Sequence, residues 1–226
     1  MPSTAREWEI FEQTRYSDRF LLHYDDHPQA PRQLWGAYDD EGIFVFQAFC
    51  PSIAGDAVRK GYFDRGFRLN RMSWIKPSLG WMLHRSDYGR KENQERILRI
   101  KIPHAAFETI LRNAALAQFD DSPLSDRSKW KRTVARKPCR IQWDPDRDLE
   151  GKKLPWRAIQ IGLRGEVLEN YAREWILELS DFTPFVRRLL DELDSQGTPT
   201  VEFLPAEKQY PLDEKLAAAI GCDVTQ

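Results

Sequence analysis

The chain has 226 residues, of which 41% are hydrophobic and 31% charged, and its net charge is -1. These values are ordinary for a globular protein with one large or two small domains. No apolar run approaches the ~18 residues of a membrane span, and the N-terminus lacks the apolar segment of a secretion signal. The three cysteines, Cys50, Cys139 and Cys222, are far apart and odd in number. They argue against a disulfide framework and a zinc ribbon, and they predict a cytoplasmic protein.

The charge is unevenly distributed along the chain. Residues 57–99 hold 11 Lys or Arg against 4 acids, residues 125–164 hold 12 against 5, and residues 166–226 hold 5 against 13. If the two basic blocks meet in the fold, they form a positively charged face. The alternative is a set of separately solvated surfaces with no shared role.

The N-terminal third predicts an arm followed by the start of a domain. Residues 1–31 are polar and end in H-P-Q-A-P, which indicates a lead-in arm. Residues 33–38 and 43–49 are aromatic and β-branched runs that predict a hairpin, with Gly42 at a left-handed position of the turn between them.

Prolines and glycines set the bounds of the next elements. Pro51 predicts the start of a helix that Gly61 ends. A strand at 72–76 leads into a helix that begins at Pro77 and ends near Ser86. After a polar loop at 87–93, the alternating residues 96–102 predict a half-buried strand. Pro103 then opens a helix whose apolar face is expected to include Phe107, Ile110, Leu111 and Leu116.

The second half alternates strands and helices around a long connection. Residues 119–138 indicate an irregular basic loop, residues 139–143 a strand and residues 144–148 (D-P-D-R-D) a turn. A strand at 156–163, a helix after Gly165, a strand at 175–179 and a helix capped by Thr183 follow. An apolar run at 201–204 and a short helix near Leu216 complete the chain.

This order of elements predicts an α+β fold. Because the opening hairpin requires antiparallel pairing while strands and helices interleave, we expect a mixed, largely antiparallel sheet with flanking helices. The expected domains are an N-terminal arm at 1–31, a single α+β domain at 32–196, and a C-terminal tail at 197–226 packed on that domain.

The segment R-M-S-W-I-K-P-S-L-G-W-M-L-H-R, residues 71–85, is the strongest candidate for a ligand site. Trp74 and Lys76 are two residues apart on a strand and project to one face. Ser78 stands at a helix start, where free N–H groups favour anions. An indole beside an ammonium suits a stacked ring and a phosphate, and Arg71 and Arg85 add positive charge. The alternative is that Trp74 and Trp81 are core residues and Lys76 extends to solvent.

A second cluster lies in W-R-A-I-Q-I-G-L-R-G-E. Gln160 is expected to face away from Ile159 and Ile161, beside small residues that would let a ligand approach closely. Arg164, between Gly162 and Gly165, lies in a turn that suits a phosphate. An ordinary half-exposed strand explains the pattern equally well. Gln47, within an apolar strand, is either a satisfied core amide or a ligand contact.

Other classes of site have weaker support. His23 and His27 have the i, i+4 spacing of metal ligands on a helix, but Pro28 and the nearby aspartates indicate a turn, so we predict no metal site. The sequence contains no P-loop, no dinucleotide G-x-G-x-x-G and no Ser-His-Asp order. Residues 125–140 combine basic residues with Trp130, which suits a nucleic-acid backbone and one stacked base, while a solvated basic helix is the alternative.

Five motifs together resemble a bacterial and fungal domain-of-unknown-function family, family 4291. They are R-Q-L-W-G-A-Y-D, V-F-Q-A-F-C-P-S-I-A, the 71–85 segment, Q-W-D-P-D-R-D and I-Q-I-G-L-R-G-E. The resemblance runs from about Arg32 to Phe185, and it implies no established activity.

The order of elements also resembles the ADP-ribosyltransferase layout. That resemblance implies an NAD site in which a first-strand residue holds the nicotinamide ribose, an aromatic or serine stacks the nicotinamide, and a late-strand acid or amide meets the reacting carbon. Gln47, Trp74 with Ser78, and Gln160 would take these places. Gln47 stands where the layout has His or Arg, and Gln160 where it usually has Glu.

These observations lead to two functional hypotheses. The first is a cytoplasmic NAD-dependent ADP-ribosyltransferase-like protein that modifies a nucleic acid or a small molecule. In it Lys76 and Gln160 are catalytic, and Gln47, Arg71, Trp74, Ser78, Arg85 and Arg164 bind the nucleotide. The second is a non-enzymatic nucleic-acid-binding module that uses Arg71, Lys76, Arg85 and residues 125–140. A third reading, in which the tryptophans are simply core in an interaction scaffold, remains open.

Overall fold

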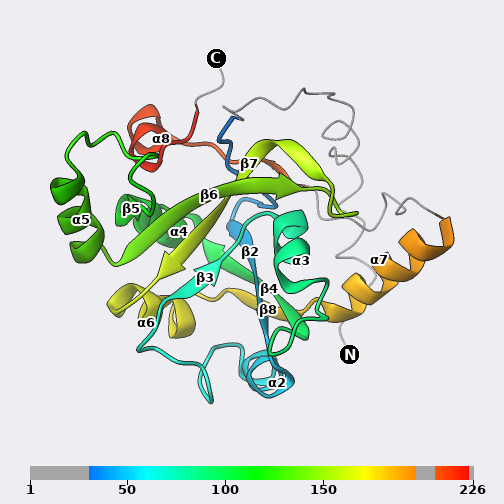
Figure 1. The fold of residues 1–226 in the computed structure, drawn as a ribbon. Helices are drawn as coiled ribbons and strands as arrows, with labels where there is room; N and C mark the ends of the chain where they lie inside the picture. The colour runs from blue at the N-terminus through cyan, green and yellow to red at the C-terminus, as the bar shows by residue number, and fades with distance from the viewer. Residues whose placement is uncertain (1–30, 197–206, 224–226) are drawn as a thin grey trace.

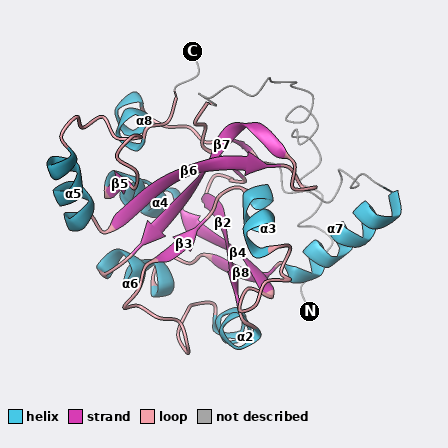
Figure 2. Cartoon of the chain, in the orientation of Figure 1, coloured by secondary structure: helices cyan, strands magenta, loops and turns pink. Residues whose placement is uncertain are grey.

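A computed structural model describes residues 31–196 and 207–223. The fold is α+β, as the sequence predicts, with seven helices and three mixed, mostly antiparallel sheets within those ranges. Figures 1 and 2 show the sheets at the centre of the molecule and the helices around them.

The first larger sheet has the strand order β2-β4-β8. Strand β2 (Gly42–Phe49) pairs antiparallel along its whole length with β4 (Arg96–Pro103), and β4 pairs antiparallel with β8 (Glu178–Asp181). The second larger sheet has the order β3-β7-β6-β5. Its strands are β3 (Ser73–Ile75), β5 (Ala114–Leu116), β6 (Cys139–Arg147) and β7 (Lys153–Leu163). Only the β5–β6 pair in this sheet is parallel.

The two larger sheets meet where β2 passes the end of β3. The backbone N–H of Phe46 donates to the carbonyl of Lys76 at 2.7 Å, and the N–H of Lys76 donates back to Phe46 at 3.1 Å. This reciprocal bridge holds Lys76 at the junction between the sheets, which is the position from which the site is built.

The predicted opening hairpin forms only next to its turn, where the Phe44 N–H donates to the Ala37 carbonyl at 2.9 Å. Strand β1 (Trp35–Gly36) pairs with β9 (Lys208–Gln209), and only a single bridge, Tyr38 to Ile43, joins the two predicted strands. Gly42 is also not left-handed. It is required because a Cβ there would lie 2.1 Å from the carbonyl oxygen of Ile102 on the neighbouring strand.

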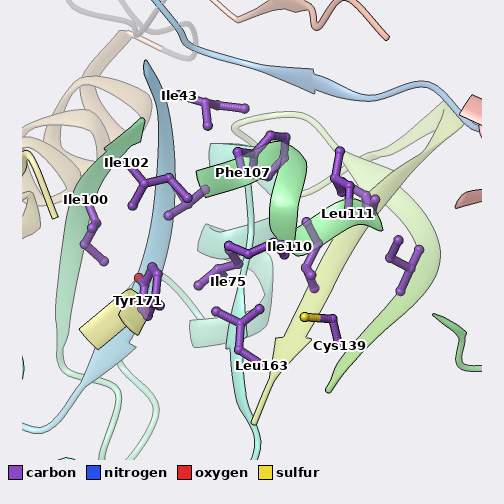
Figure 3. Close-up of a cluster of buried hydrophobic side chains, with 14 of the residues drawn as sticks. Ile43, Ile75, Ile100, Ile102, Phe107, Ile110, Leu111, Cys139, Leu163 and Tyr171 are labelled. Carbon is purple, nitrogen blue, oxygen red and sulfur yellow. The ribbon is translucent and has the colours of Figure 1, made fainter. Parts of the chain in front are cut away.

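The main core fills the space between the two larger sheets (Figure 3). Alternate residues of the paired strands supply it, since successive side chains of a strand point to opposite faces. Ile43, Ile100, Ile102, Ile75 and Leu163 are all completely buried there. One face of the β3-β7-β6 sheet therefore packs in the core. The side chains of the opposite face do not belong to that core and can contact a ligand.

Within the described residues, seven helices surround the sheets, as Figure 2 shows. They are α2 (Pro51–Lys60), α3 (Leu79–Ser86), α4 (His104–Arg112), α5 (Arg127–Arg136), α6 (Glu166–Arg173), α7 (Thr183–Gln196) and α8 (Glu214–Ile220). The predicted starts at Pro51 and after Gly165 are confirmed, and Gly61 ends α2 in a left-handed conformation with φ 79°. Helix α3 begins two residues after Pro77, with Ser78 as its N-cap.

Several predicted bounds are corrected. Residues 119–138 are not irregular throughout, because they contain α5, which Asp126 caps by accepting from two backbone N–H groups. Leu116 lies in β5 rather than on the preceding helix. The predicted turn at 144–148 is mostly strand, since β6 continues through Pro145 with an irregular register to Arg147.

The C-terminal residues 207–223 are part of the domain. Leu216 and Ile220 of α8 join the main core, and the indole N–H of Trp143 donates to the Ile220 carbonyl at 2.8 Å. The apolar run 201–204 and most of the predicted arm lie outside the described residues.

Candidate functional site

A pocket of about 1020 Å³ opens where the two larger sheets meet. Residues from β2, α2, β3, α3, β6 and β7, and from the loops between them, line it. Four cations and one carboxylate contribute to the lining: Arg68, Arg71, Lys76, Arg85 and Asp144. The pocket is thus large enough for a nucleotide-sized ligand and has an excess of positive charge.

The floor of the pocket is the face of the β3-β7-β6 sheet that the core does not use. Trp74 pairs with Gly162, and Gly162 pairs with Arg140 on the far side. One step along, Gln160 pairs with Gln142. The intervening residues Ile75, Ile141 and Ile161 are buried in the core. Trp74 and Gln160, eighty-six positions apart in sequence, therefore lie on neighbouring strands of one pocket.

Lys76 is the most unusual residue of the pocket. Only 7% of the residue is exposed, yet within the described chain its ammonium makes no hydrogen bond and no ion pair. Burial, reinforced by the positive charge of Arg85, lowers the pKa of Lys76 to about 8, while the Asp144 carboxylate acts in the opposite direction. A buried cation without a fixed partner is costly, and its free donors face the pocket that it lines.

Asp144 joins the two glutamines of the floor. Its Oδ2 accepts from the Gln160 side-chain amide at 2.5 Å, and its Oδ1 accepts from the Gln142 amide at 2.8 Å. Gln142 and Asp144 line the pocket. The sequence singled out neither, because Gln142 lay in the predicted strand 139–143 without a recognised role and D-P-D-R-D indicated a turn at Asp144. Their spacing of two, on either side of buried Trp143, was the available signal for a strand face.

Trp74 is half-buried and lines the pocket. Gly162 has a different role from the predicted one, because its missing side chain makes room for protein rather than ligand. A Cβ there would lie 2.5 Å from the Met72 sulfur and 3.1 Å from the indole Cε2 of Trp74. The glycine thus lets the indole lie against β7.

Gln47 lies at the junction of the sheets with all its groups engaged. Its amide donates to the Ser73 hydroxyl at 2.8 Å and to the Trp74 carbonyl at 3.1 Å, and its carbonyl oxygen accepts from the Tyr171 hydroxyl at 2.8 Å. Of the two predicted alternatives, the satisfied core amide describes these contacts. Gln47 lines the pocket, and it holds the strand that carries Trp74.

Ser78 does not lie in the pocket lining. Its hydroxyl donates to buried Asp146 at 2.9 Å and accepts from the Trp81 backbone N–H at 3.3 Å. The Leu79 N–H donates to the Glu207 carboxylate at 2.6 Å. The predicted anion site at this helix start is thus already filled by a carboxylate of the same chain.

Of the predicted arginines, two reach the pocket and one does not. Arg71 and Arg85 are exposed and line it, and Arg68 joins them, which the sequence had not singled out. Arg164 instead donates to the carbonyls of Ala135 and Lys137, the latter at 2.9 Å, at the end of α5. Trp130, predicted to stack a base, donates its indole N–H to the Leu116 carbonyl at 2.9 Å and packs against Phe119.

Cys50 also lines the pocket. In the sequence it served only as one of the three cysteines that argue against a disulfide framework. It is the N-cap residue of α2. Hydrogen bonds from the Ser52 hydroxyl and the Ile53 N–H lower the pKa of its thiol. Burial raises the pKa of the other two cysteines, Cys139 and Cys222.

Residues 33–210 match the family described as "Domain of unknown function (DUF4291)". The chain belongs to this family. The match covers every element from β1 to β9 and includes all the residues that line the pocket. A search of curated proteins found no match.

Metal-binding clusters and membrane-spanning helices are two further features that the described residues could contain. The described part of the chain brings together no three His, Cys, Asp or Glu side chains that could hold a metal ion. His23 and His27 lie outside the described residues. None of the helices within 31–196 and 207–223 combines the length and apolar character that crossing a bilayer requires.

Proposed function

We propose that the pocket binds NAD through its phosphates and one of its rings, and that the protein transfers ADP-ribose from it. The observation that supports this most directly is Lys76, a buried cation with no partner among the described residues in a pocket of about 1020 Å³. Burying the Lys76 ammonium costs desolvation free energy that no described ion pair offsets. A ligand that places negative charge beside the ammonium would offset this cost when it binds. A phosphate is the group that an ammonium and nearby guanidiniums bind best.

The surroundings of Lys76 favour a nucleotide over a simple anion. Trp74 offers a half-exposed indole on the pocket floor, and an indole face stacks on a base or a nicotinamide ring. Arg71 and Arg85 line the pocket, and their guanidiniums form no ion pair with another described residue, which suits a second phosphate. A ring and two phosphates are the recognition elements of a dinucleotide.

The pair of Asp144 and Gln160 supports the transfer chemistry. In this proposal Gln160 would take the place where the ADP-ribosyltransferase layout usually has Glu, and its amide donates a hydrogen bond to the Asp144 carboxylate at 2.5 Å. In the proposed reaction the bond between the ribose carbon and the nicotinamide nitrogen breaks, and nicotinamide leaves with the bonding electrons. An acceptor oxygen or nitrogen then forms the new bond to that carbon and loses its proton. Asp144 would stabilise the positive charge that develops on the ribose.

Calorimetric titration with NAD and with ADP-ribose tests the binding step. Lys76→Met removes the charge and keeps the volume, and we expect it to weaken binding by about 10- to 100-fold, the usual value of a charge-assisted contact. Lys152→Met is the matched control, since its side chain is 72% exposed and outside the pocket lining. If the wild type gives no binding at millimolar ligand, or if Lys76→Met binds equally well, the proposed site is wrong.

Release of nicotinamide tests the chemical step. We expect Asp144→Asn to retain NAD binding within a few-fold and to lose at least about 100-fold in release, because a charge that acts mainly in the transition state is removed. Binding without any release by the wild type, in the presence of RNA, DNA and protein acceptors, would reject the transferase and leave a nucleotide-binding protein.

A further inference from the structure

Helix α5 differs from other helices of the molecule in its unpaired charge. Its ten residues, R-S-K-W-K-R-T-V-A-R, hold five cations and no acid, and none of them is buried. Arg127, Lys129, Lys131, Arg132 and Arg136 are all exposed, and none forms an ion pair with another described residue. On α2, Lys60 pairs with Asp56 at 3.1 Å, and on α7, Arg188 pairs with Glu192 at 3.1 Å. Neutralising partners are thus present elsewhere and missing on α5.

The aromatic residue of α5, Trp130, packs against its own domain. Trp130 is fixed to β5 by its hydrogen bond to Leu116 and packs against Phe119, while the Arg127 guanidinium lies 4.6 Å from the Phe119 ring centre. The exposed large hydrophobic residues of the described chain, Val58, Tyr62 and Leu177, all lie elsewhere. A helix that presents cations without an exposed apolar stripe suits a polyanion better than a lipid surface.

The basic helix is connected to the pocket through the same sheet face. Arg140 pairs with Gly162, which pairs with Trp74, so with strands ~4.8 Å apart the backbones of Arg140 and Trp74 are about 10 Å apart. Arg140 and Arg164 donate to the Lys137 carbonyl just beyond the end of α5, at 2.7 and 2.9 Å. In Figure 1, α5 lies beside the end of the sheet where β6 begins. Two basic residues, the mostly buried Arg140 and Arg164, therefore lie between the end of α5 and the strand that carries Trp74.

We infer that α5 binds the phosphate backbone of a single-stranded nucleic acid whose end or unpaired nucleotide reaches the pocket. The helix supplies about 15 Å of cationic surface. From the Arg140 backbone, four residues beyond the end of α5, about 10 Å remains to the Trp74 backbone, which one or two nucleotides span. A single strand fits because only an unpaired nucleotide can leave its neighbours to enter a pocket. This inference deepens the proposed function and rests on it in one respect, since it makes the strand the acceptor of the transferred group.

Fluorescence anisotropy with labelled RNA and DNA oligonucleotides of about 12 nucleotides, as single strands and as duplexes, tests this surface. The variant Lys129→Glu/Arg132→Glu/Arg136→Glu reverses three cations at i, i+3 and i+7, which share one side of the helix. We expect it to lose about 10- to 100-fold in affinity for single strands at physiological salt. The slope of log affinity against log salt should fall by about 2, as expected when about three phosphate contacts are lost.

The matched control is Lys152→Glu/Arg173→Glu/Arg187→Glu, which changes the net charge equally at three exposed positions away from α5. It should bind within about threefold of the wild type. Circular dichroism and thermal unfolding of both variants establish that they fold, and the triple glutamine variant at 129, 132 and 136 provides the same test with less repulsion. Equal losses in the α5 variant and the control would show general charge attraction and overturn the inference.

Three other outcomes also overturn it. They are no wild-type binding to any oligonucleotide, duplex binding at least as tight as single-strand binding, and equally tight α5-dependent binding to anionic lipid vesicles. The failures of the two proposals are distinguishable. The α5 variant should still bind NAD in calorimetry, and Lys76→Met should still bind the oligonucleotide through α5. A wild-type protein that lacks one of the two binding activities and has the other therefore identifies which proposal is wrong.

Discussion

Two buried lysines, one in each of the larger sheets, have opposite surroundings. Lys101 on β4 is 2% exposed, and its ammonium contacts three carboxylates, Glu41 at 2.6 Å, Asp39 at 2.8 Å and Glu178 at 3.2 Å. Lys76 at the end of β3 is 7% exposed and has no such partner among the described residues. Burial alone would lower the pKa of both. The three carboxylates reverse this and raise the pKa of Lys101, whereas the pKa of Lys76 falls to about 8.

Lys101 thus stabilises the fold through its ion pairs, whereas buried Lys76 lowers the stability of the ligand-free protein. The ion pairs of Lys101 tie the loop before β2 to the strands β4 and β8, so its charge is useful without any ligand. Lys76 contributes no comparable contact and carries an uncompensated desolvation cost. Residues that destabilise the free protein are expected where function requires them.

The sharpest test of the comparison is to replace each lysine by methionine. Lys76→Met should stabilise the protein at pH 7 by as much as about 3 kcal/mol, because a lowering from 10.5 to about 8 corresponds to 1.36 kcal/mol per pKa unit. Lys101→Met should destabilise it by about 1–2 kcal/mol, since three partly exposed ion pairs are lost. Denaturant unfolding of both variants measures the two changes. If both substitutions changed the free energy of unfolding in the same direction, the proposed contrast between Lys76 and Lys101 would be wrong.

The pH dependence of stability gives a second test of nearly the same size. The pKa of Lys76 is lower in the folded protein than in the unfolded chain, so between pH 8 and 10.5 the unfolded chain binds more protons. The contribution of Lys76 to the free energy of unfolding therefore becomes less unfavourable as the pH rises from 8 to 10.5. The stability advantage of Lys76→Met over the wild type should shrink by about 3 kcal/mol from pH 7.5 to 10.5. An advantage that stays constant over this range would mean that Lys76 does not titrate there.

Ligand affinity should respond to the same titration. Phosphate binding needs the protonated ammonium, so NAD affinity should fall by about tenfold per pH unit above pH 8 and be level below it. Arg85 lowers the pKa of Lys76 and Asp144 raises it, so Arg85→Ala should move the midpoint of this profile up and Asp144→Asn should move it down. Calorimetry from pH 6.5 to 9.5 measures the midpoints. Movement of both midpoints in one direction would contradict the assigned electrostatics.

The smallest expected effect is at the paired lysine. Glu178→Gln removes the longest of the three contacts of Lys101, and its side chain is 46% exposed. We expect a loss below about 1 kcal/mol that decreases further in 1 M salt, because exposed ion pairs are screened. Thermal unfolding at low and high salt measures it. A larger, salt-independent loss would show that Lys101 depends on one partner rather than on three.

Local features of the fold were predictable from the sequence because short-range chemistry determines them. Pro51 and Gly61 set the bounds of α2, and the alternation around Gln160 assigned the two faces of β7 correctly. Strand pairing was not predictable, because it depends on contacts far apart in the chain. The residues expected to form the opening hairpin illustrate this, since β1 pairs instead with β9, and Trp35 lies opposite Gln209.

The candidate site was predictable in part for the same reason. Trp74, Lys76 and Gln160 have strand spacings that place them on one face, and the structure brings all three to the pocket. Asp144 was not predicted because it precedes Pro145, and proline usually indicates a turn. In the structure β6 continues through Pro145 with an irregular register. Nothing near Ser78 in sequence could indicate that Asp146 and Glu207 occupy the start of α3.

The contact between Glu207 and the Leu79 N–H has a consequence for protein synthesis. Helix α3 carries Trp81 and Arg85 to the pocket, yet the carboxylate that completes its first turn is translated 128 positions later. On the ribosome, a nascent chain that has already made every residue of the pocket lining still lacks this cap. The first turn of α3 therefore gains its Glu207 contact only after the C-terminal segment has emerged from the exit tunnel.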